Sequence, residues 1–327
     1  MFGLFSKKSK YISCDLIEHG LDFFTDSINF CCRIPPDDKA GYKKILDNYF
    51  GEKIDWKNFF KIKRFYRNEM KKGNIIPECR NCIYLREDEW DNDDYISFIN
   101  FNNWTICNEH CVYCWLNDAD RPHQKQYNVY PAVKDMAEKG YLRKGGNITI
   151  AGGEPSSAPE FDDLIKLFID YDLNSIRILT NASKYSAVLE QGIKEGRLNI
   201  VVSVDSGTKE TFIKVKRRDF YDIVWNNIRR YAAVQPASDR VKTKFILIPG
   251  INDTEEEIEL WLDKSIKAGV KHIAFDIEMM WHDRNKDNIP DKIMQLVKFT
   301  LDKVKEKGLD IELIDRGVIL AEKLKQK

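Results

Sequence analysis

From residue 95 onward, two patterns of apolar positions alternate along the chain. Short runs rich in β-branched and aromatic residues, which are typical of strands, lie at 95–101, 147–151, 175–180, 199–204, 243–248 and 272–277, with a weaker run at 309–314. Between them, segments with apolar residues at helical spacing lie at 129–139, 160–171, 185–195, 220–233, 255–268 and 292–307. This alternation predicts βαβ units and a parallel sheet.

The number of units limits the architecture. Six strand–helix units are too few to close a regular eight-stranded barrel. We therefore expect an α/β fold of the partial (β/α)6 barrel type, with a doubly wound open sheet as the alternative. Acidic residues at 253 and 255–257 precede an apolar segment and indicate a helix start, because a helix N-terminus is electropositive.

The first 94 residues lack the alternation, so residues 1–94 are expected to form an N-terminal extension and 95–327 the barrel with C-terminal helices. Part of 39–72 is expected to be helical, with apolar residues at helical spacing in 42–49. The acidic run at 87–94 is interpreted as a linker or a solvated loop.

Composition narrows the class of protein. The 327 residues include 43% hydrophobic and 12% aromatic residues, enough for a sizeable core. Lys and Arg number 52 and Asp and Glu number 52, so the balance argues against binding to nucleic acid or to a membrane surface by bulk charge. We find no pattern of a secretory signal and no apolar stretch long enough to span a bilayer, and expect a cytoplasmic protein.

The eight cysteines all lie within the first 114 residues, and in a reducing compartment clustered thiols favour metal binding or redox chemistry. Three of them, Cys107, Cys111 and Cys114, are spaced by four and three residues after the first strand. Three thiolates on one loop can hold three irons of a [4Fe-4S] cluster and leave the fourth iron open to a small molecule. The alternative is a zinc site with His110 as the fourth ligand.

This triplet, with the aromatic Tyr113 before its last cysteine, resembles the cluster loop of the radical S-adenosylmethionine (SAM) superfamily. The segment Gly152-Gly153-Glu154-Pro155 after the second strand resembles the GGEP motif of that family. Glycines let a backbone approach a ligand closely, and a carboxylate can pair with an ammonium group. The resemblance covers about residues 95–280 and implies a partial barrel that binds a [4Fe-4S] cluster and SAM.

The resemblance also implies roles for residues at the carboxyl ends of the strands, where ligands bind in parallel α/β folds. Glu154 and the backbone of its loop would hold the amino group of SAM. Further contacts would come from Tyr113, Asn181, Ser203, Asp205, Lys216 and Ile248. Lys214, Lys216, Arg217 and Arg218 are the candidate cations for the SAM carboxylate, and the sequence does not distinguish among them.

The implied reaction is a one-electron cleavage of SAM into methionine and a 5′-deoxyadenosyl radical, which abstracts a hydrogen atom from the substrate. The electron would come from a donor such as flavodoxin or ferredoxin. Our first hypothesis for the substrate is a peptide or protein side chain. The alternatives are oxidation or epimerisation of a sugar or another small metabolite, and a non-catalytic iron–sulfur sensor or binding module.

The remaining cysteines predict a second site. Cys14, Cys79, Cys82 and one of the adjacent pair Cys31 and Cys32, here taken as Cys31, are interpreted as ligands of an auxiliary iron–sulfur cluster, with structural zinc as the alternative. The radical SAM families with auxiliary clusters usually carry these cysteines in a C-terminal extension, and this chain has none there. Cys32 is left over and is a candidate hydrogen-atom donor, although a plain buried thiol is the simpler interpretation.

Residues after the sixth strand supply the candidate substrate contacts. A substrate pocket combines apolar walls with a few polar groups. Glu278, Trp281 and His282 lie where the mouth of the barrel is expected, and they are our candidates, with a capping loop as the equally weighted alternative.

Overall fold

The structure is a computed structural model that describes residues 8–31, 46–47, 49, 51–76, 79–80, 82, 84–117 and 126–325. The chain divides into two compact units. Unit 1 comprises Met1–Thr105, His123–Gly153 and Pro159–Ile176, and unit 2 comprises Ile106–Pro122, Glu154–Ala158 and Arg177–Lys327. Each unit has its own core, since buried apolar side chains line the strands of both.

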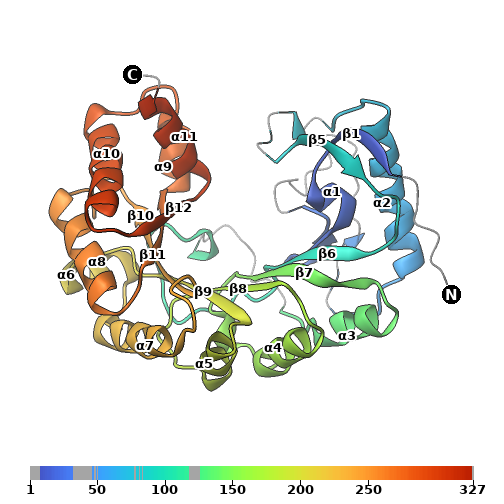
Figure 1. Ribbon diagram of the computed structural model, residues 1–327, viewed down its shortest axis with the longest axis horizontal. Helices are drawn as coiled ribbons and strands as arrows, with labels where there is room; N and C mark the ends of the chain where they lie inside the picture. The colour runs from blue at the N-terminus through green and yellow to red at the C-terminus, as the bar shows by residue number, and fades with distance from the viewer. Residues whose placement is uncertain are drawn as a thin grey trace. The chain divides into compact units, whose positions relative to one another are not determined.

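Unit 1 is built on parallel strands (Figure 1). β6 (Ile96–Phe101) pairs in parallel with β7 (Leu142–Ile150) on one side and with β2 (Gly20–Phe23) on the other. β3 (Ser27–Asn29) and β4 (Leu46–Asp47) continue the sheet in antiparallel order. The helices of this unit are α1 (Asp15–His19), α2 (Trp56–Lys71), α3 (Tyr130–Glu138) and α4 (Phe161–Asp170).

The N-terminal residues differ from two sequence predictions. The acidic run is not a linker or loop at its start, because β5 (Arg86–Trp90) pairs antiparallel with β1 (Ser9–Ser13). Its charged side chains are exposed while its backbone is paired, and the indole of Trp90 donates to the carbonyl of Tyr11 (3.0 Å). The prediction that part of 39–72 is helical is confirmed by α2 (Trp56–Lys71). The helical spacing at 42–49 is misleading at Leu46–Asp47, which form a strand, because pairing with β3 overrides local spacing.

Unit 2 contains five strands in the order β8-β9-β10-β11-β12. They are β8 (Ser175–Thr180, of which 177–180 belong to unit 2), β9 (Leu198–Ser203), β10 (Val241–Leu247), β11 (His272–Ile277) and β12 (Asp310–Leu313). β10 pairs in parallel with β9 and β11, and β11 with β12. The parallel α/β prediction is confirmed.

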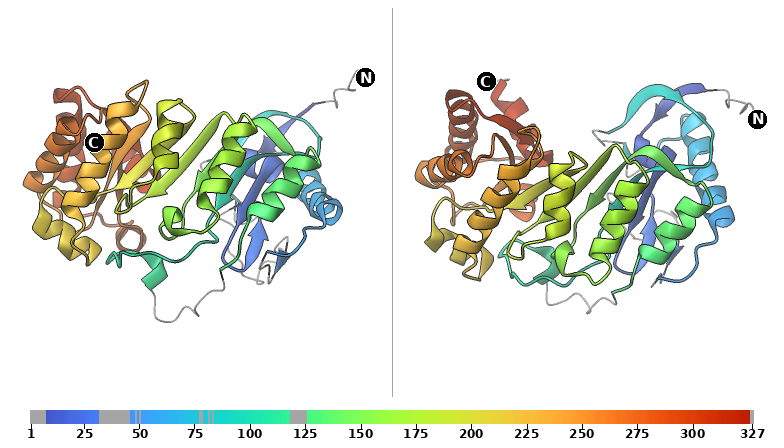
Figure 2. Two further views of the ribbon diagram at one scale, coloured as in Figure 1. Left: turned by 90° about the horizontal axis from the view of Figure 1, so that it is seen from below. Right: turned by 60° about the horizontal axis from the view of Figure 1, so that its bottom comes forward.

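The helices of unit 2 follow their strands in the chain (Figures 1 and 2). Within the described residues they are α5 (Ala187–Lys194), α6 (Lys209–Lys216), α7 (Tyr221–Val234), α8 (Glu255–Lys267), α9 (Met279–Asn285), α10 (Asp291–Glu306) and α11 (Asp315–Lys325). The α8 helix begins as predicted, since the Thr254 side chain accepts the Glu257 N–H (3.2 Å) and three glutamates occupy its first turn. The helices α6 and α9 were not predicted from the sequence.

Among the residues that the structure describes, none of the helices combines the length and the apolar character that crossing a bilayer requires.

Candidate functional site

The cysteine loop, residues 107–114, is fixed to the end of α6. The His110 N–H donates to the carbonyl of Lys216 (3.1 Å) and the Val112 N–H to that of Val215 (2.9 Å). These bonds use carbonyls at the C-terminus of α6 that have no partner inside the helix. The loop therefore has a defined backbone position next to the charged residues at the end of α6.

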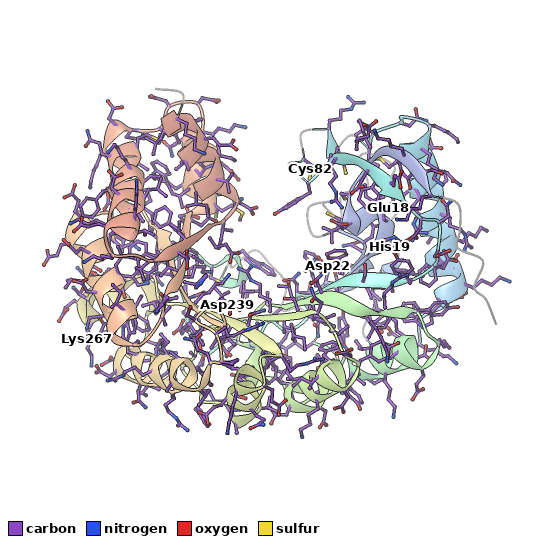
Figure 3. All side chains as sticks on the ribbon, in the orientation of Figure 1. Glu18, His19, Asp22, Cys82, Asp239 and Lys267 are labelled. Carbon is purple, nitrogen blue, oxygen red and sulfur yellow. The ribbon has the colours of Figure 1, made fainter. Side chains whose placement is uncertain are left out.

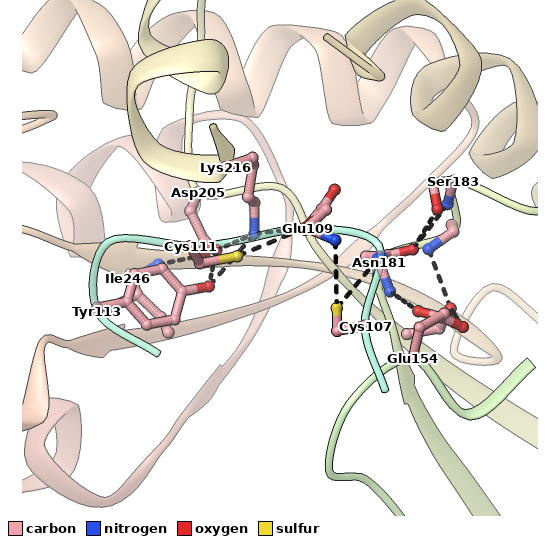
Figure 4. Close-up of polar contacts among 12 residues, drawn as sticks. Cys107, Glu109, Cys111, Tyr113, Glu154, Asn181, Ser183, Asp205, Lys216 and Ile246 are labelled. Carbon is pink, nitrogen blue, oxygen red and sulfur yellow. Dashed lines mark hydrogen bonds and ion pairs between the residues drawn. The ribbon is translucent and has the colours of Figure 1, made fainter. Parts of the chain in front are cut away.

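The first cysteine is joined to the residue that follows β8 (Figure 4). The Cys107 sulfur accepts the Glu109 N–H (3.5 Å) and lies 3.8 Å from Asn181 Nδ2, which acts as a donor. The same Nδ2 donates to Asn108 Oδ1 (2.8 Å). Asn181, predicted as a cofactor residue, thus contacts the cysteine loop directly.

Glu154 is fully buried and accepts four hydrogen bonds. Its Oε1 accepts from the Ser156 N–H (3.2 Å), the Ser156 hydroxyl (2.7 Å) and the Thr180 hydroxyl (2.8 Å). Its Oε2 accepts from the Asn181 N–H (2.7 Å). Burial raises the pKa of this carboxyl, and the hydrogen bonds oppose that rise. Glu154 therefore ties its own loop to the end of β8.

The two glycines before Glu154 allow a close approach of backbones. Gly152 has φ +98°, and a Cβ at this position would lie 2.3 Å from the carbonyl oxygen of Trp104. The Gly153 N–H donates to that carbonyl (2.7 Å), and the Glu154 N–H donates to the Ile106 carbonyl (2.8 Å). The GGEP-like loop therefore lies against the segment that leads into the cysteine loop.

A buried group of charged residues lies beside the cysteine loop (Figure 4). The Lys216 ammonium is 2.7 Å from Asp205 Oδ2 and 3.8 Å from Glu109 Oε2, and it donates to the Tyr113 hydroxyl (3.3 Å). Tyr113 in turn donates to Asp205 Oδ2 (2.5 Å). Burial disfavours the charge of Lys216, but the surrounding anions outweigh burial and raise its pKa. Lys216 is thus a charged, fully buried residue with carboxylate partners.

Glu109 was not identified from the sequence. Its Oε1 is buried without a hydrogen-bond partner among the described residues. Burial raises the pKa of its carboxyl to about 7, with Lys216 opposing the rise. In the sequence, Glu109 stands out only by its position between Cys107 and Cys111. A solvent-exposed glutamate in the same loop would look identical.

Asp205 organises the ends of β9 and β10. It has φ +58°, and its Oδ1 accepts the Ile246 N–H (2.8 Å). Asn252, also missed from the sequence, donates to the carbonyls of Asp205 (2.9 Å) and Ile246 (2.8 Å) and accepts the Ile248 N–H (2.6 Å). Of the two other predicted cofactor residues here, Ser203 is half-buried and Ile248 is buried.

The three thiols of the loop are half-buried and protonated in this environment. Burial raises the pKa of Cys107 to about 11, of Cys111 to about 12 and that of Cys114 as well, with Lys216 opposing the rise at Cys111 and Cys114. Binding of iron displaces such protons. In the described part of the chain, no three Cys, His, Asp or Glu side chains lie close enough together to hold one metal ion. In a cubane the requirement is different, because each thiolate binds a different iron.

The donor set of this loop fits an iron–sulfur cluster. It offers three thiols, N–H donors aimed at the Cys107 sulfur, and the buried Lys216 cation, which lowers the energy of nearby thiolates. The predicted ligands are therefore brought into one environment with the residues expected to bind SAM.

The predicted substrate residues lie around the start of α9. The Glu278 carboxylate caps this helix, accepting the N–H groups of Met280 (2.9 Å) and Trp281 (2.5 Å). His282 is buried, and its Nε2 has no hydrogen-bond partner among the described residues, while Trp281 is half-buried. Their role as substrate contacts stays a prediction.

The N-terminal cysteines lie in unit 1, with Cys14, Cys31 and Cys79 buried and Cys82 half-buried. Burial raises the pKa of Cys14 to about 11, and negative charge at Cys31 and Cys82 raises it further, so these thiols are close enough to interact. The Cys82 N–H donates to the Cys79 carbonyl (2.9 Å). Cys32, the candidate hydrogen-atom donor, lies outside the described residues.

Curated relatives match about half of the chain. This chain is 28% identical over 189 residues to the GTP 3′,8-cyclase of Desulforamulus reducens, and the match covers 55% of this chain and 57% of the relative. It is 25% identical over 176 residues to the GTP 3′,8-cyclase of Psychromonas ingrahamii, covering 52% and 50%. The chain thus spans about half the length of these relatives.

Solved structures extend the likeness of the fold. The crystal structure of Streptococcus suis SuiB bound to the precursor peptide SuiA superposes with a TM-score of 0.56 at 13% identity, covering 85% of this chain and 60% of SuiB. The partial-barrel fold class is confirmed. Residues 104–262, which include the cysteine triplet and the Gly152–Pro155 loop, match the family model of the radical SAM superfamily. The chain belongs to the radical SAM superfamily.

Proposed function

We propose that this chain is an enzyme that binds a [4Fe-4S] cluster through Cys107, Cys111 and Cys114 and uses it to cleave SAM. When bound and reduced, the cluster and SAM supply methionine and a 5′-deoxyadenosyl radical, which takes a hydrogen atom from the substrate. The observation that carries the proposal is the chain of contacts from Cys107 through Asn181 to Glu154, which links the two family motifs (Figure 4).

The residues of this chain would bind and orient SAM. The backbone of Gly152–Pro155 and the Glu154 carboxylate are proposed to hold its amino group. Glu154 is buried next to the end of β8, and its carboxylate oxygens act as hydrogen-bond acceptors. Asn181, Ser203, Asp205, Ile248 and Tyr113 are proposed to border the rest of the molecule. Among the four candidate cations, we propose Lys216 as the partner of the SAM carboxylate, since it is buried beside the cysteine loop, where it also pairs with Asp205.

The electron is proposed to come from a protein such as flavodoxin or ferredoxin. For the substrate, our first hypothesis is a peptide or protein side chain, and it is supported by the fold shared with the peptide-bound SuiB structure. A small metabolite is the alternative, and it is supported by relatives named for a reaction of GTP. In the metabolite case, radical oxidation, epimerisation or rearrangement are the candidate reactions.

The thiols of Cys14, Cys31, Cys79 and Cys82 are proposed to bind a second iron–sulfur cluster, with structural zinc as the alternative. The proposal is supported by their shared place in unit 1 and by the electrostatic interaction of Cys14 with Cys31 and Cys82. Residues 1–94 would then serve as the extension that carries this site.

The decisive test is formation of 5′-deoxyadenosine by the reconstituted, reduced protein under anaerobic conditions. We expect SAM-dependent product from the wild type and none from Cys111→Ala, because a cluster ligand is lost. The matched control is His110→Ala, which changes the neighbouring exposed residue and should keep both the iron and the product.

Two results would contradict the proposal. A wild type that holds iron but never cleaves SAM would favour the sensor or binding module. Loss of the bound metal in His110→Ala, with zinc in the wild type, would favour the zinc site.

A further inference from the structure

The strands of unit 2 have two chemically different faces. On β10, Val241, Thr243, Phe245 and Leu247 are buried, and Phe245 packs on Trp261 of α8 with ring centroids 5.0 Å apart. The alternate residues are half-buried and largely polar, and α5, α7 and α8 lie along the opposite face (Figures 1 and 2). We call the face away from these helices the inner face; its half-buried residues include Arg177, Leu179, Asn199, Ser203, Lys242, Lys244, Ile246 and Glu312.

A polar inner face requires a reason. Strands of parallel α/β folds are usually apolar on both faces, because both faces are covered. Half-exposed charged side chains in this position therefore indicate a face that meets solvent or a polar ligand.

The charges of the inner face do not balance. Glu312 binds two cations at once, Arg177 (2.6 Å) and Lys242 (2.7 Å). Lys244, one pleat further along β10, adds a third cation to this face. Three positive side chains of this face thus stand beside two carboxylates, Glu312 and Asp276, the latter opposite Ile246 in the register of β10 and β11.

Lys244 itself has no hydrogen-bond or ion-pair partner for its ammonium among the residues that the structure describes. The two carboxylates whose charge it senses, Asp205 and Asp276, are already bound elsewhere. Asp205 accepts from Lys216, Tyr113 and the Ile246 N–H, and Asp276 Oδ1 accepts the N–H groups of Arg316 (3.1 Å) and Gly317 (3.0 Å).

The residues beside Lys244 in the sheet have short side chains. In the parallel register it lies opposite Ser203 on β9 and Ala274 on β11, both small side chains. Lys242, by contrast, lies opposite Val201 and His272 and is occupied by Glu312. Lys244 also interacts electrostatically with Cys111 and Cys114, so it lies on the cluster side of the inner face.

We infer that Lys244 binds an anionic group, a carboxylate or a phosphate, of the substrate on the inner face of unit 2. This inference deepens the proposed function, since it assigns the substrate of the same site to the class of anionic molecules or anionic side chains. A lysine ammonium flanked by small residues suits such a group as a point charge.

The test uses pyridoxal 5′-phosphate, an anionic aldehyde that forms an imine with an unprotonated lysine amine, releasing water, and is fixed by borohydride reduction. Burial lowers the pKa of Lys244, with Asp205 opposing the fall, and labelling is done at alkaline pH, because imine formation requires the unprotonated amine. Peptide mass spectrometry of the labelled holoenzyme should find Lys244 modified at least fivefold more than Lys242. Pyrophosphate should protect it in a concentration-dependent way.

Further outcomes distinguish an anion of the substrate from the carboxylate of SAM. They also distinguish failure of this inference from failure of the proposed function. Protection by SAM alone, with none by pyrophosphate, would assign Lys244 to the SAM carboxylate and overturn the inference. Equal labelling of Lys242 and Lys244 would also overturn it. Because labelling needs no SAM cleavage, a protein that makes no 5′-deoxyadenosine yet shows protected Lys244 would refute only the proposed function.

Variants check the same point in solution. Lys244→Gln should lose pyrophosphate binding, measured by calorimetry, at least tenfold, while Lys244→Arg keeps most of it and Lys242→Gln changes it less than threefold. Circular dichroism establishes that each variant is folded. Unchanged pyrophosphate binding in a folded Lys244→Gln protein would overturn the inference.

Discussion

At the scale of single residues, the buried charges near the cysteine loop depend on one another. Lys216 and Asp205 are both fully buried and 2.7 Å apart, and Glu109 and Tyr113 complete the group. The sequence predicted Tyr113, Asp205 and Lys216 as separate cofactor contacts. Their mutual pairing follows from the turn after β9 and the end of α6, which no local pattern encodes.

Removing one partner of this pair should destabilise the fold. Lys216→Met leaves Asp205 and Glu109 buried without their ion-pair partner, and we expect the free energy of unfolding to fall by about 3–5 kcal/mol. Anaerobic urea denaturation measures it. The double variant Lys216→Met with Asp205→Asn should recover part of the loss, and a double variant as unstable as the sum of both single changes would contradict the pairing.

The buried carboxyl of Asp22, in unit 1, should make the free energy of unfolding depend on pH (Figure 3). It is fully buried, and burial raises the pKa of its carboxyl to about 7, above the value of ~3.9 in an unfolded chain. The folded protein therefore holds this proton to higher pH than the unfolded chain. The free energy of unfolding is therefore not affected by the titration of Asp22 below pH ~4. Between pH ~4 and ~7 it falls as pH rises, by up to about 4 kcal/mol in total.

Asp22→Asn should remove that loss while keeping the acceptor for Asn102 Nδ2 (3.1 Å). The measurement is the free energy of unfolding at pH 5 and pH 8 in both proteins. We expect the variant to lose less stability across this range than the wild type, since other titrating groups are common to both. Identical pH dependence in the two proteins would show that Asp22 is ionised in the folded state.

At the scale of elements, the alternation of apolar patterns was a reliable guide from residue 96 onward. The bounds of α8, β8 and β11 match the predicted segments within one or two residues, because their buried faces repeat at the period of the element. The short helix α6 was missed, since half of its eight residues are charged and its apolar positions are too few to mark a helical period. The strand β5 was missed because its pairing partner lies 70 or more residues away.

The close packing of the loop after β7 should make alanine costly at Gly152. A Gly152→Ala change places a Cβ against the Trp104 carbonyl oxygen and also requires φ +98°, so we expect a loss of about 2–3 kcal/mol or more. The matched control is Gly145→Ala, which has φ +73° in open space and should cost about 1–2 kcal/mol.

Thermal and urea unfolding of the two glycine variants measure these losses. Iron retention and 5′-deoxyadenosine formation should fall in Gly152→Ala and remain near wild type in Gly145→Ala. A Gly152→Ala protein as stable as the control would mean that the loop can move away from Trp104.

At the scale of the whole molecule, the two sets of cysteines predict a metal content. Three thiols lie in unit 2 and four described thiols in unit 1, so two clusters would give about eight irons per chain. Iron and acid-labile sulfide are counted on anaerobically reconstituted protein. Cys82→Ala should lower the count toward four, while Cys111→Ala should remove the other four.

A wild-type count near four irons, unchanged by Cys82→Ala, would refute the second iron–sulfur cluster. Zinc found in place of the additional iron would support the structural alternative at these four cysteines.

The sequence by itself determined the α/β class, most helices and strands of the barrel, and the cysteine and glycine motifs, because these depend on local periodicity and spacing. It also placed the predicted cofactor residues at the ends of strands. Only the tertiary structure decided that Lys216 pairs with Asp205, that Asn252 joins the ends of two strands and that Lys244 has no partner among the described residues. Such pairings join residues distant in the chain, and burial fixes their energies, so neither can be read from local patterns.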